Sequence, residues 1–348
     1  MRHRIVAWDL GGAHLKYAVV DARGELTAIR QLACPLWQGL DRLTDRLRVA
    51  FAALGGSTAR LHAVTMTGEL CDCFRDRQQG VARILETFTA LAGPVPITVY
   101  GGRAGWLTPA DAAPAWRAIA SANWHATAAC VALTDSEGVL VDVGSTTTDL
   151  VPYGSGEVRS RALTDADRLA ADELVYTGVC RTPVMALCDR VPYVDGWQGL
   201  AAEYFANTAD VYRLTGELPP DADLHPTADG GPRDLAASAR RLARMVGRDA
   251  DDESVHALER LARYLATVQF GKLQQALSAV VARASAGPDF PLLVGAGVGE
   301  FLVQRLAAFN GTPYRPFAAL ADAPPALAHA AAVCAPAVAL ARLAAQRS

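Results

Sequence analysis

The sequence predicts an α/β protein with two lobes, on three observations. Two acid-glycine segments, residues 9–16 (DLGGAHLK) and 142–149 (DVGSTTTD), follow one pattern in separate parts of the chain. Apolar strand-like runs alternate with helical patterns, which is typical of an α/β sheet. The length of 348 residues exceeds the usual size of a domain with one core. The chain therefore has enough apolar sequence to fill two cores.

The first part of the chain opens with three strands and a helix. Strands are predicted over 4–10, 15–21 and 25–31, and a helix is predicted over 40–54, ending at the pair Gly55-Gly56. The elements that follow are a buried strand over 61–66, an amphipathic helix over 78–92, a strand over 97–100 and a long apolar helix over 113–132. This order predicts a three-stranded meander followed by alternating helices and strands.

The second part begins with another pair of strands, over 138–141 and 147–153, and becomes irregular between residues 200 and 252. Prolines and glycines in that stretch indicate loops between short helices of an inserted segment. The remaining elements are a helix over 255–284, an apolar run over 290–293, a glycine-rich turn over 294–299 and a buried C-terminal helix within 323–345. We place the lobes at 1–134 and 135–348, with a helical insertion over residues 200–255.

Composition excludes several classes of protein. The net charge is −3 and the basic residues are scattered, so we expect neither nucleic acid nor a membrane surface as a partner. The apolar stretch 323–345 contains prolines, a histidine and an arginine, which argues against a membrane span. The seven cysteines form neither a disulfide framework nor a zinc pattern. With no secretory apolar region before the first strand, a cytoplasmic location is expected. Assembly into a homo-oligomer stays open.

Each acid-glycine segment forms the tip of a predicted hairpin, because it lies between two strand-like runs. Glycine lets the backbone turn tightly and approach a ligand, so that consecutive N–H groups can face phosphate oxygens. The candidate phosphate-binding residues of the two tips are Gly11, Gly12, Ala13, Lys16, Gly144, Ser145, Thr146 and Thr147. Solvated turns and a surface lysine are the alternative interpretation.

The aspartate at the start of each tip can hold a divalent cation. Magnesium prefers few protein oxygens together with water and substrate oxygens, which suits two carboxylates that face a polyphosphate. Asp9 and Asp142 are the candidate metal ligands. Their alternative role is to accept hydrogen bonds from the hairpin backbone.

The paired hairpins resemble those of the superfamily that contains sugar kinases, acetate kinase, actin and the 70-kDa heat-shock proteins. In that superfamily, two ribonuclease-H-like lobes each supply a phosphate hairpin, and a third glycine segment lies near the nucleotide. The resemblance implies that Gly295 and Gly297 belong to this third segment, as further candidate phosphate-binding residues, and that Lys16 contacts phosphate. Ala13 departs from the pattern, because a hydroxyl residue usually follows the two glycines.

Three further segments resemble one family in particular: 65–81 (TMTGELCDCFRDRQQGV), 121–124 (SANW) and 176–183 (YTGVCRTP). Together with the first hairpin, they are similar to the hydantoinase/oxoprolinase-like proteins encoded with tetrahydromethanopterin-linked one-carbon pathways. Archaeal members of that family are methanofuran-biosynthesis synthases. The resemblance implies a transferase that joins an aminomethylfuran-methyl diphosphate to the phenol of γ-glutamyltyramine and releases diphosphate.

A phenol has a pKa of about 10, so this reaction benefits from a nearby base. Glu69 and Asp72 are the candidate bases, since they follow the predicted strand 61–66 and ligand crevices form at strand ends. Lys16 is a further candidate catalytic residue. The candidate substrate-binding residues are Arg75, Arg77, Asn123, Trp124 and Arg181. The alternatives are a helix start at Glu69, surface ion pairs for the arginines and a core position for Trp124.

Three other functions stay open. An ATP-dependent small-molecule kinase would use the same hairpins, with ATP as cofactor beside magnesium and Glu69 or Asp72 as the base. An ATP-assisted hydrolase that opens a cyclic amide fits the family name, although the sequence offers no histidine cluster for a dinuclear metal centre. A nucleotide-dependent switch of the actin type would need a partner that reads the angle between the lobes.

Overall fold

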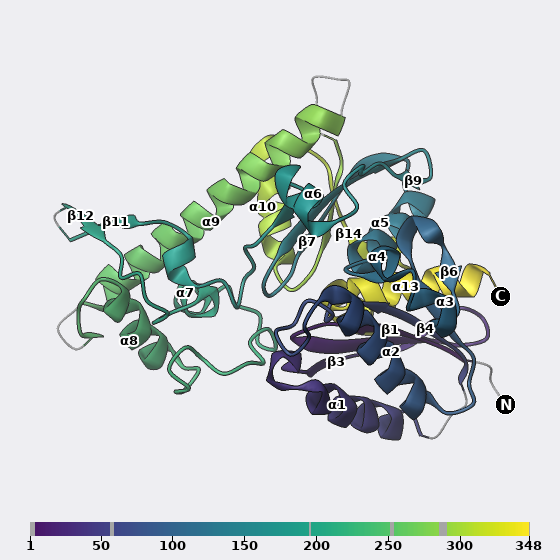
Figure 1. The fold of residues 1–348 in the computed structure, drawn as a ribbon. Helices are drawn as coiled ribbons and strands as arrows, with labels where there is room; N and C mark the ends of the chain where they lie inside the picture. The colour runs from purple at the N-terminus through teal and green to yellow at the C-terminus, as the bar shows by residue number, and fades with distance from the viewer. Residues whose placement is uncertain (1–3, 56–58, 195, 251–253, 285–290, 348) are drawn as a thin grey trace. The chain divides into compact units, whose positions relative to one another are not determined.

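The computed structural model describes residues 4–55, 59–194, 196–250, 254–284 and 291–347 (Figure 1). The chain forms two compact units whose segments alternate along the sequence. Unit 1 comprises Met1–Leu140, Val151–Asp167 and Arg315–Ser348, and unit 2 comprises Val141–Leu150 and Arg168–Tyr314. The predicted lobes, 1–134 and 135–348, use a single division of the chain. They group the segments differently from these units and stay a prediction.

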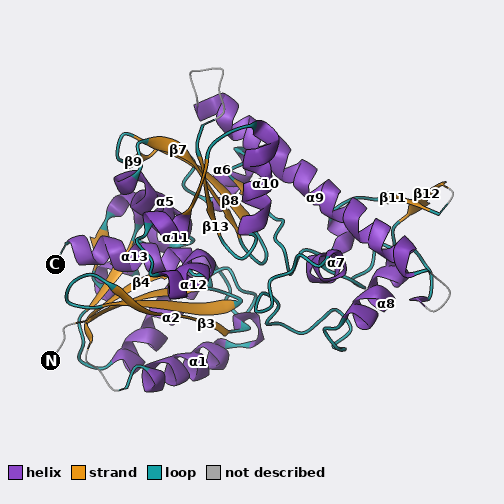
Figure 2. Ribbon diagram, turned by 180° about the vertical axis from the view of Figure 1, so that it is seen from behind, coloured by secondary structure: helices purple, strands orange, loops and turns teal. Residues whose placement is uncertain are grey.

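Unit 1 is built on a mixed sheet in the strand order β3-β2-β1-β4-β5-β6. Figure 2 labels β3 and β4 of this sheet. Its strands are β1 (Arg4–Leu10), β2 (His14–Val20), β3 (Leu26–Ala33), β4 (Ala59–Met66), β5 (Ile97–Tyr100) and β6 (Trp106–Leu107). β1 pairs antiparallel with β2 and parallel with β4, and β2 pairs antiparallel with β3. The predicted meander and the two strands after it are confirmed, with small shifts at their ends.

Two helices cover one face of this sheet. They are α1 (Leu40–Ala53) and α2 (Arg77–Ala92), close to the predicted bounds, and Gly56 at the expected end of the first lies outside the described residues. Asp76 caps α2 by accepting a hydrogen bond from Gln79 N at 2.8 Å. The side chains that fill this core include Trp8, Leu43, Leu47, Ile84 and Phe88. The apolar stripes of both helices therefore hold the sheet that carries the first hairpin.

The opposite face of the sheet carries small residues. Ala7 lies between Ala18 of β2 and Ala63 of β4 in the strand register, and all three are fully buried. α13 (Ala335–Gln346), which is itself rich in buried alanine, packs on these strands. Small side chains on both surfaces let the helix approach the sheet closely. The alanine-rich C-terminal stretch is therefore part of the core of unit 1.

The predicted C-terminal helix is in fact two helices. α12 (Ala328–Val333) and α13 meet at Cys334, and the segments Pro325–Val333 and Ala335–Gln346 are bent by 109°. Pro336 stands in the first turn of α13, where its missing N–H costs no helical hydrogen bond. Among the described residues, no single helix is long and apolar enough to cross a membrane. The bent pair meets the length and composition criteria only when its two segments are taken together.

The predicted apolar helix over 113–132 is also wrong as one element. The structure has α3 (Pro109–Ala112), α4 (Trp116–Ile119) and α5 (Asn123–Thr134). Pro114, which cannot donate a helical hydrogen bond, lies between the first two. Ser121 lies between the last two with a left-handed φ of 52°. Its backbone conformation turns the chain and sets the start of α5.

A second sheet has the strand order β10-β8-β7-β13-β14, with β9 paired to β8. Its strands are β7 (Glu137–Val143), β8 (Thr148–Gly154), β9 (Glu157–Val158), β10 (Leu174–Val175), β13 (Leu293–Ala296) and β14 (Tyr314–Pro316). The predicted strands 138–141 and 147–153 are confirmed. The turn predicted over 294–299 starts too early, because Gly295 lies inside β13. Phe290, in the predicted apolar run, lies outside the described residues.

The long helix predicted over 255–284 is confirmed as α9 (Val255–Ala284). The other helices are α6 (Asp165–Ala170), α7 (Thr208–Thr215), α8 (Leu235–Met245), α10 (Glu300–Asn310) and α11 (Phe317–Leu320). β11 (Arg190–Tyr193) and β12 (Gly196–Gly199) form a separate hairpin. The short 3-10 helices are Leu36–Gln38, Gly102–Ala104, Val184–Ala186 and Pro325–Leu327. Two sheets with flanking helices confirm the predicted α/β class.

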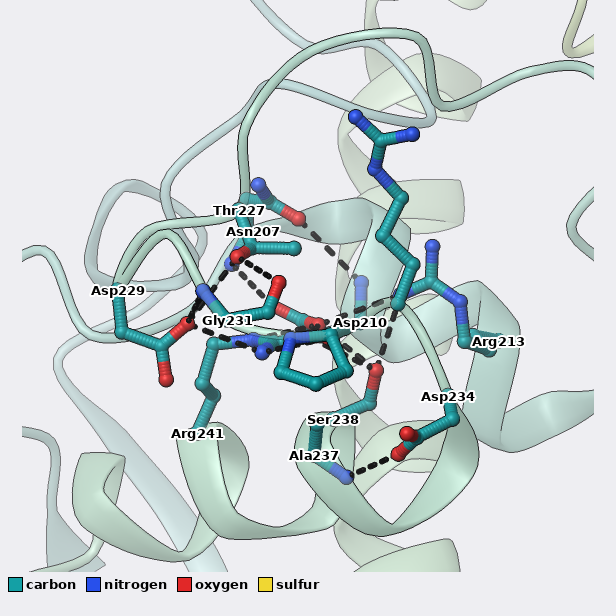
Figure 3. Close-up of polar contacts among 12 residues, drawn as sticks. Asn207, Asp210, Arg213, Thr227, Asp229, Gly231, Asp234, Ala237, Ser238 and Arg241 are labelled. Atoms are coloured by element: carbon teal, nitrogen blue, oxygen red, sulfur yellow. Dashed lines mark hydrogen bonds and ion pairs between the residues drawn. The ribbon is translucent and has the colours of Figure 1, made fainter.

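A buried ion pair organises the segment predicted as a helical insertion. Arg241 on α8 donates to Asp210 Oδ1 on α7 through Nε at 2.9 Å and Nη2 at 2.7 Å, and both side chains are almost fully buried (Figure 3). Arg241 Nη1 also donates to Asp229 Oδ1 at 3.1 Å, which ties the intervening loop to the same cation. Breaking a buried pair of this kind costs about 3–5 kcal/mol. Because these groups bond to one another, the network has a structural role.

Candidate functional site

The first hairpin, residues 9–16, joins β1 to β2 in unit 1. Asp9 stands opposite Lys16 in the strand register of β1 and β2. Gly11 N donates to His14 O at 3.0 Å, which closes the turn. A Cβ atom on Gly11 would lie 2.7 Å from His14 O, so a side chain there would force the turn open. Asp9 is buried, with 3% of its surface exposed. The predicted acid-glycine tip is therefore a tight turn that follows a buried carboxyl.

The segment that follows β4 packs against this first hairpin. Thr67 N and Gly68 N donate to Leu10 O at 3.2 and 3.0 Å. A Cβ atom on Gly12 would lie 2.7 Å from Cys71 Sγ. The parallel pairing of β1 with β4 brings the two strand ends together, as expected for an α/β sheet. Segment 65–81, one of the three family-like segments, thus forms the wall of the first hairpin.

The second hairpin, residues 142–149, joins β7 to β8 and is closed by the same hydrogen bond. Gly144 N donates to Thr147 O at 2.8 Å, as Gly11 N does to His14 O in the first hairpin. Its tip carries hydroxyl groups, and Ser145 Oγ lies 3.4 Å from Thr146 Oγ1. The repeat seen in the sequence is therefore a repeat of backbone geometry.

Segment 176–183 packs on the second hairpin within unit 2. Val179 N donates to Gly144 O at 3.1 Å, and Arg181 N donates to Ser145 O at 2.8 Å. A Cβ atom on Gly178 would lie 2.4 Å from Thr146 N, so this backbone can approach only because residue 178 is glycine. The guanidinium of Arg181 donates from Nη1 to Thr146 Oγ1 at 3.3 Å. The structure thus brings a predicted substrate-binding arginine to a predicted phosphate-binding tip.

Buried side chains hold Gly178 in this position. Its carbonyl oxygen accepts hydrogen bonds from Thr208 Oγ1 at 2.8 Å and from Gln269 Nε2 at 2.9 Å. Gln269 is fully buried on α9, and Tyr212 donates to its Oε1 at 2.7 Å. Because these hydrogen bonds hold the backbone around Gly178 in place, its polar groups need little reorganisation when a ligand binds. Gln269 carried no sequence signal, because it lies far along the chain on a long helix.

The glycine-rich segment 294–299 lies beside the acid end of the second hairpin. Gly297 has a φ of 85°, and a Cβ atom there would lie 2.4 Å from Asp142 Oδ1. Gly299 N donates to Val143 O at 2.8 Å. Gly295 differs, because a Cβ atom on it would lie 2.7 Å from the Tyr314 ring. Gly297 is therefore next to a predicted metal ligand, whereas protein atoms surround Gly295 inside β13.

Glu69 is the most enclosed of the predicted catalytic residues. It lies in the turn after β4 and does not start a helix, since α2 begins at Arg77. A Cβ atom on Gly80 would lie 2.3 Å from Glu69 O, so glycine lets α2 pack on this turn. Burial raises the pKa of Glu69 to about 7, against the lowering effect of a hydrogen bond from Ser121. Such a carboxyl can exchange a proton near neutral pH.

Ser121, Asp165 and Arg77 form a polar cluster with Glu69 in unit 1. Ser121 Oγ donates to Glu69 Oε1 at 2.8 Å and lies 3.4 Å from Asp165 Oδ2. The Arg77 guanidinium donates from Nη2 to Asp165 Oδ2 at 2.5 Å. Neither Ser121 nor Asp165 was predicted as a site residue. Ser121 opens the SANW segment, which was a signal, whereas Asp165 belongs to no recognised motif.

The other predicted residues of unit 1 lie outside this cluster. Asp72 and Arg75 are exposed, and Arg75 pairs with its neighbour Asp76 at 3.0 Å. Lys16 Nζ donates to Val333 O at 2.9 Å, near the C-terminal end of α12. That bond gives Lys16 a structural role. Its contact with phosphate stays a prediction.

Asn123 and Trp124 stand at the start of α5. Asn123 Oδ1 accepts a hydrogen bond from Trp124 N at 2.7 Å. The Trp124 side chain is buried, with 5% of its surface exposed, and its ring lies against that of His125. Burial favours the core position for Trp124, so stacking on an aromatic substrate stays a prediction.

Metal binding by Asp9 and Asp142 also stays a prediction. Within the described ranges, no group of three or more His, Cys, Asp and Glu side chains is placed to hold a metal ion. Asp9 and Asp142 each stand at a strand end directly before a hairpin turn. A single carboxylate in this position fits the small number of protein oxygens that magnesium takes beside a phosphate ligand.

A cavity of about 810 Å³ in unit 1 lies away from these residues. It is bordered by Ile5 at the start of β1, by the turn at Asp21–Gly24 and by Arg342 on α13. None of the predicted site residues lines it. Because the first hairpin stands at the other end of β1, this cavity does not belong to the candidate site.

Comparison with known proteins agrees with the family-like segments. A model of the hydantoinase/oxoprolinase family matches residues 60–347. The chain belongs to this family. The matched residues include Gly144 of the second hairpin, segment 65–81 beside the first hairpin and segment 176–183. The resemblance inferred from those segments is therefore confirmed at the level of the hydantoinase/oxoprolinase family.

Two relatives of this hydantoinase/oxoprolinase protein carry one enzyme name, (4-{4-[2-(γ-L-glutamylamino)ethyl]phenoxymethyl}furan-2-yl)methanamine synthase. The protein from Methanocaldococcus jannaschii is 32% identical over 267 residues, which cover 75% of this chain and 78% of the relative. The protein from Methanococcus vannielii is 34% identical over 126 residues, which cover 35% of this chain and 56% of that relative. Both relatives are enzymes by name.

Solved structures share the fold at much lower identity. Acetone carboxylase in its nucleotide-free form aligns over 88% of this chain and 67% of its own, with a TM-score of 0.50 and 10% identity. A PilM–PilN type IV pilus biogenesis complex aligns over 98% of both chains, with a TM-score of 0.50 and 12% identity. These likenesses concern the fold alone. Both structures align with the predicted α/β fold that the two sheets form here.

Proposed function

We propose that this protein is a transferase in the biosynthesis of a methanofuran-type cofactor. It would join an aminomethylfuran-methyl diphosphate to the phenol of a γ-glutamyltyramine-like substrate and release diphosphate. The observation that carries the proposal is the 32% identity to the M. jannaschii synthase across 75% of this chain and 78% of that relative. The name of that relative describes a phenoxymethyl-furan, which contains the ether bond that this transfer forms.

In this proposal each hairpin is a phosphate-binding element built from the groups of its own unit. The second hairpin offers Ser145, Thr146 and the Arg181 guanidinium, which already contacts Thr146. Guanidinium groups bind phosphate oxygens strongly because they are charged donors with a fixed fork of N–H groups. The first hairpin offers the backbone of Gly12 and Ala13. Asp9 and Asp142 are the candidate carboxylates for magnesium, which when bound would offset negative charge on the diphosphate.

Glu69 acts as the base in this proposal. The phenol O–H bond breaks as the proton moves to the Glu69 carboxylate. The phenol oxygen forms a bond to the furan-bearing CH₂ carbon, while the bond from that carbon to diphosphate breaks and its electrons leave with diphosphate. A base with a pKa of about 7 is matched to proton transfer near neutral pH. The furan ring helps by stabilising positive charge at the reacting carbon.

The test is a reaction of the purified protein and magnesium with both substrates in the absence of ATP. The proposal expects one ether product per diphosphate released, with the ether identified by mass spectrometry. ATP turnover on addition of candidate alcohols or cyclic amides, without ether formation, would replace the proposal with a kinase or an ATP-assisted hydrolase.

A further inference from the structure

The Ser121 hydroxyl stands between two carboxyl groups. Its oxygen lies 2.8 Å from Glu69 Oε1 and 3.4 Å from Asp165 Oδ2. A hydroxyl has one hydrogen, so it can donate to only one of these carboxyl groups at a time. The shorter distance assigns the hydrogen to Glu69 in this structure. Asp165 is bonded instead to the Arg77 guanidinium at 2.5 Å.

The second oxygen of Glu69 has a different environment. Glu69 Oε2 is buried and has no hydrogen-bond partner within the part of the chain that the structure describes. A buried acceptor without a partner destabilises the fold, so its retention calls for a reason. The two oxygens of one carboxyl are therefore distinct: Ser121 fixes Oε1, and Oε2 is left for another donor.

The backbone at Ser121 is strained in the same place. Its φ of 52° is a left-handed conformation that side chains other than glycine, asparagine and aspartate seldom adopt. Strained residues persist where surrounding contacts hold them, and they gather at functional sites. Here the strained residue is the one that contacts Glu69. The strain also ends α4 and lets α5 start at Asn123, which brings the hydroxyl to the carboxyl.

We propose that Ser121 is a positioning residue for Glu69. The Asp165 carboxylate, which Arg77 holds in place, is the alternative hydrogen-bond acceptor for the Ser121 hydroxyl. In the resting state the hydroxyl holds Glu69 Oε1, so that Oε2 receives the proton of the acceptor phenol. Once Glu69 is neutral it is a weaker acceptor, and the Ser121 hydrogen turns to the Asp165 carboxylate. No proton passes through Ser121, which changes only its hydrogen-bond partner. The inference rests on the proposed function for the source of the proton.

The charged groups that act on the Glu69 carboxyl come from two other elements. Asp165 lies in the first turn of α6 and opposes ionisation of Glu69, whereas Arg77 in the first turn of α2 favours it. The hydrogen bond from Ser121 favours the ionised form more strongly than Arg77 does. Removing the hydroxyl is therefore expected to raise the pKa of Glu69, and neutralising Asp165 is expected to lower it.

The test uses Ser121→Gly, because glycine accepts the left-handed backbone and removes only the hydroxymethyl group. Ser155→Gly is the matched control, since Ser155 is exposed, has a φ of 55° and lies in the turn between β8 and β9. With ¹³Cδ-labelled glutamate and Glu69→Gln to assign the signal, NMR titration measures the pKa of Glu69 directly. We expect the Glu69 titration to move to higher pH in S121G, to lower pH in D165N and not to move in S155G.

Kinetics provide the second measurement. In S121G we expect kcat to fall by about tenfold, the loss of one positioning hydrogen bond, and the acidic limb of the kcat/KM profile to shift with the Glu69 titration. An unchanged titration and pH profile in S121G would overturn the positioning role. If the titration shifts as expected but the wild-type protein forms no ether, the proposed reaction is wrong and the positioning of Glu69 stands.

Discussion

The two hairpins have the same backbone closure and different surroundings. In both, the N–H of a glycine donates to the carbonyl of the third residue after it, from Gly11 to His14 and from Gly144 to Thr147. The first tip has no hydroxyl group and packs on the segment that carries Glu69. The second tip is rich in hydroxyl groups and contacts Arg181. The same turn therefore lies beside a buried carboxyl with a raised pKa in one unit and beside an arginine guanidinium in the other.

The neighbours of the two tips also differ in how they approach. A side chain on Gly12 would meet the sulfur of Cys71, which is the end of a side chain and can move. Gly178 meets the backbone of the second hairpin at Thr146, Ser145 and Gly144, which cannot move without opening the turn. The first tip is thus adjustable at Gly12, whereas the contact of Gly178 with the second tip is fixed by backbone atoms. Two turns with the same backbone geometry can therefore differ in how well their surroundings tolerate an added side chain.

The largest effect is expected on the carboxyl beside the first hairpin. Glu69→Gln keeps the size of the side chain and removes its ability to take a proton, so kcat for ether formation should fall by about 10²- to 10⁴-fold. Asp72→Asn is the control, because Asp72 is exposed in the same segment. If Asp72→Asn causes the larger loss, the base has been assigned to the wrong residue.

The substitution Glu69→Gln, which should lower activity, is expected to raise the stability of the fold. The pKa of Glu69 is raised from 4.5 to about 7 by burial, so the folded protein holds this proton more tightly than the unfolded chain does. Stability from this group is present below pH 4.5 and is lost as the pH rises to about 7. Glu69→Gln should therefore be more stable than wild type by up to about 3 kcal/mol at pH 8. Urea unfolding at pH 5 and pH 8 measures the difference, and an equal effect at both pH values would contradict it.

The close backbone contact between Gly178 and the second hairpin leads to the next prediction, on activity. Gly178→Ala places a Cβ atom 2.4 Å from Thr146 N, so the hairpin must shift. We expect a loss of activity of about 10²-fold, as for a misplacement of reacting groups, and weaker binding of diphosphate. Gly199→Ala in β12 is the control, because no atom lies within 4 Å of its Cβ position. Equal activity in the two variants would show that the 176–183 contact is dispensable.

The smallest effect belongs to the adjustable first hairpin. Gly12→Ala meets Cys71 Sγ at 2.7 Å, and we expect a loss of about tenfold in kcat/KM, comparable to one overpacked contact. Adding Cys71→Ala removes the sulfur and should restore most of the activity. No second substitution of a single side chain should rescue Gly178→Ala. If the double variant is more active than the two single losses predict, the substitutions at residues 12 and 71 are coupled, as expected. Additive losses would contradict the expectation that the Gly12 contact is adjustable.

Local signals were sufficient to predict the elements on which the hairpins stand. Apolar alternation and glycine placement predicted β1, β2, β7 and β8, and helical periodicity gave the bounds of α9. The breaks at Ser121 and Cys334 were not predicted, because alanine-rich sequence of high helical propensity stands on both sides of each position.

The candidate site was harder to predict than the fold. Glu69 could be selected because it follows a strand, but its burial depends on Gly80 and on the chain break at Ser121. Asp165 reaches Ser121 across 44 residues of sequence. Gln269 reaches Gly178 across 91 residues. Such long-range partners leave no local pattern, so a single sequence cannot reveal them.

The most direct test of the account is whether both tips bind diphosphate. In ¹⁵N-labelled protein, amide signals can be followed while magnesium pyrophosphate is added without ATP. Shifts are expected for the amides of Gly11 and Gly12 and for those of Gly144 and Ser145, each saturating as the ligand concentration rises. Shifts at neither hairpin, with normal spectra elsewhere, would contradict the assignment of the paired hairpins to phosphate.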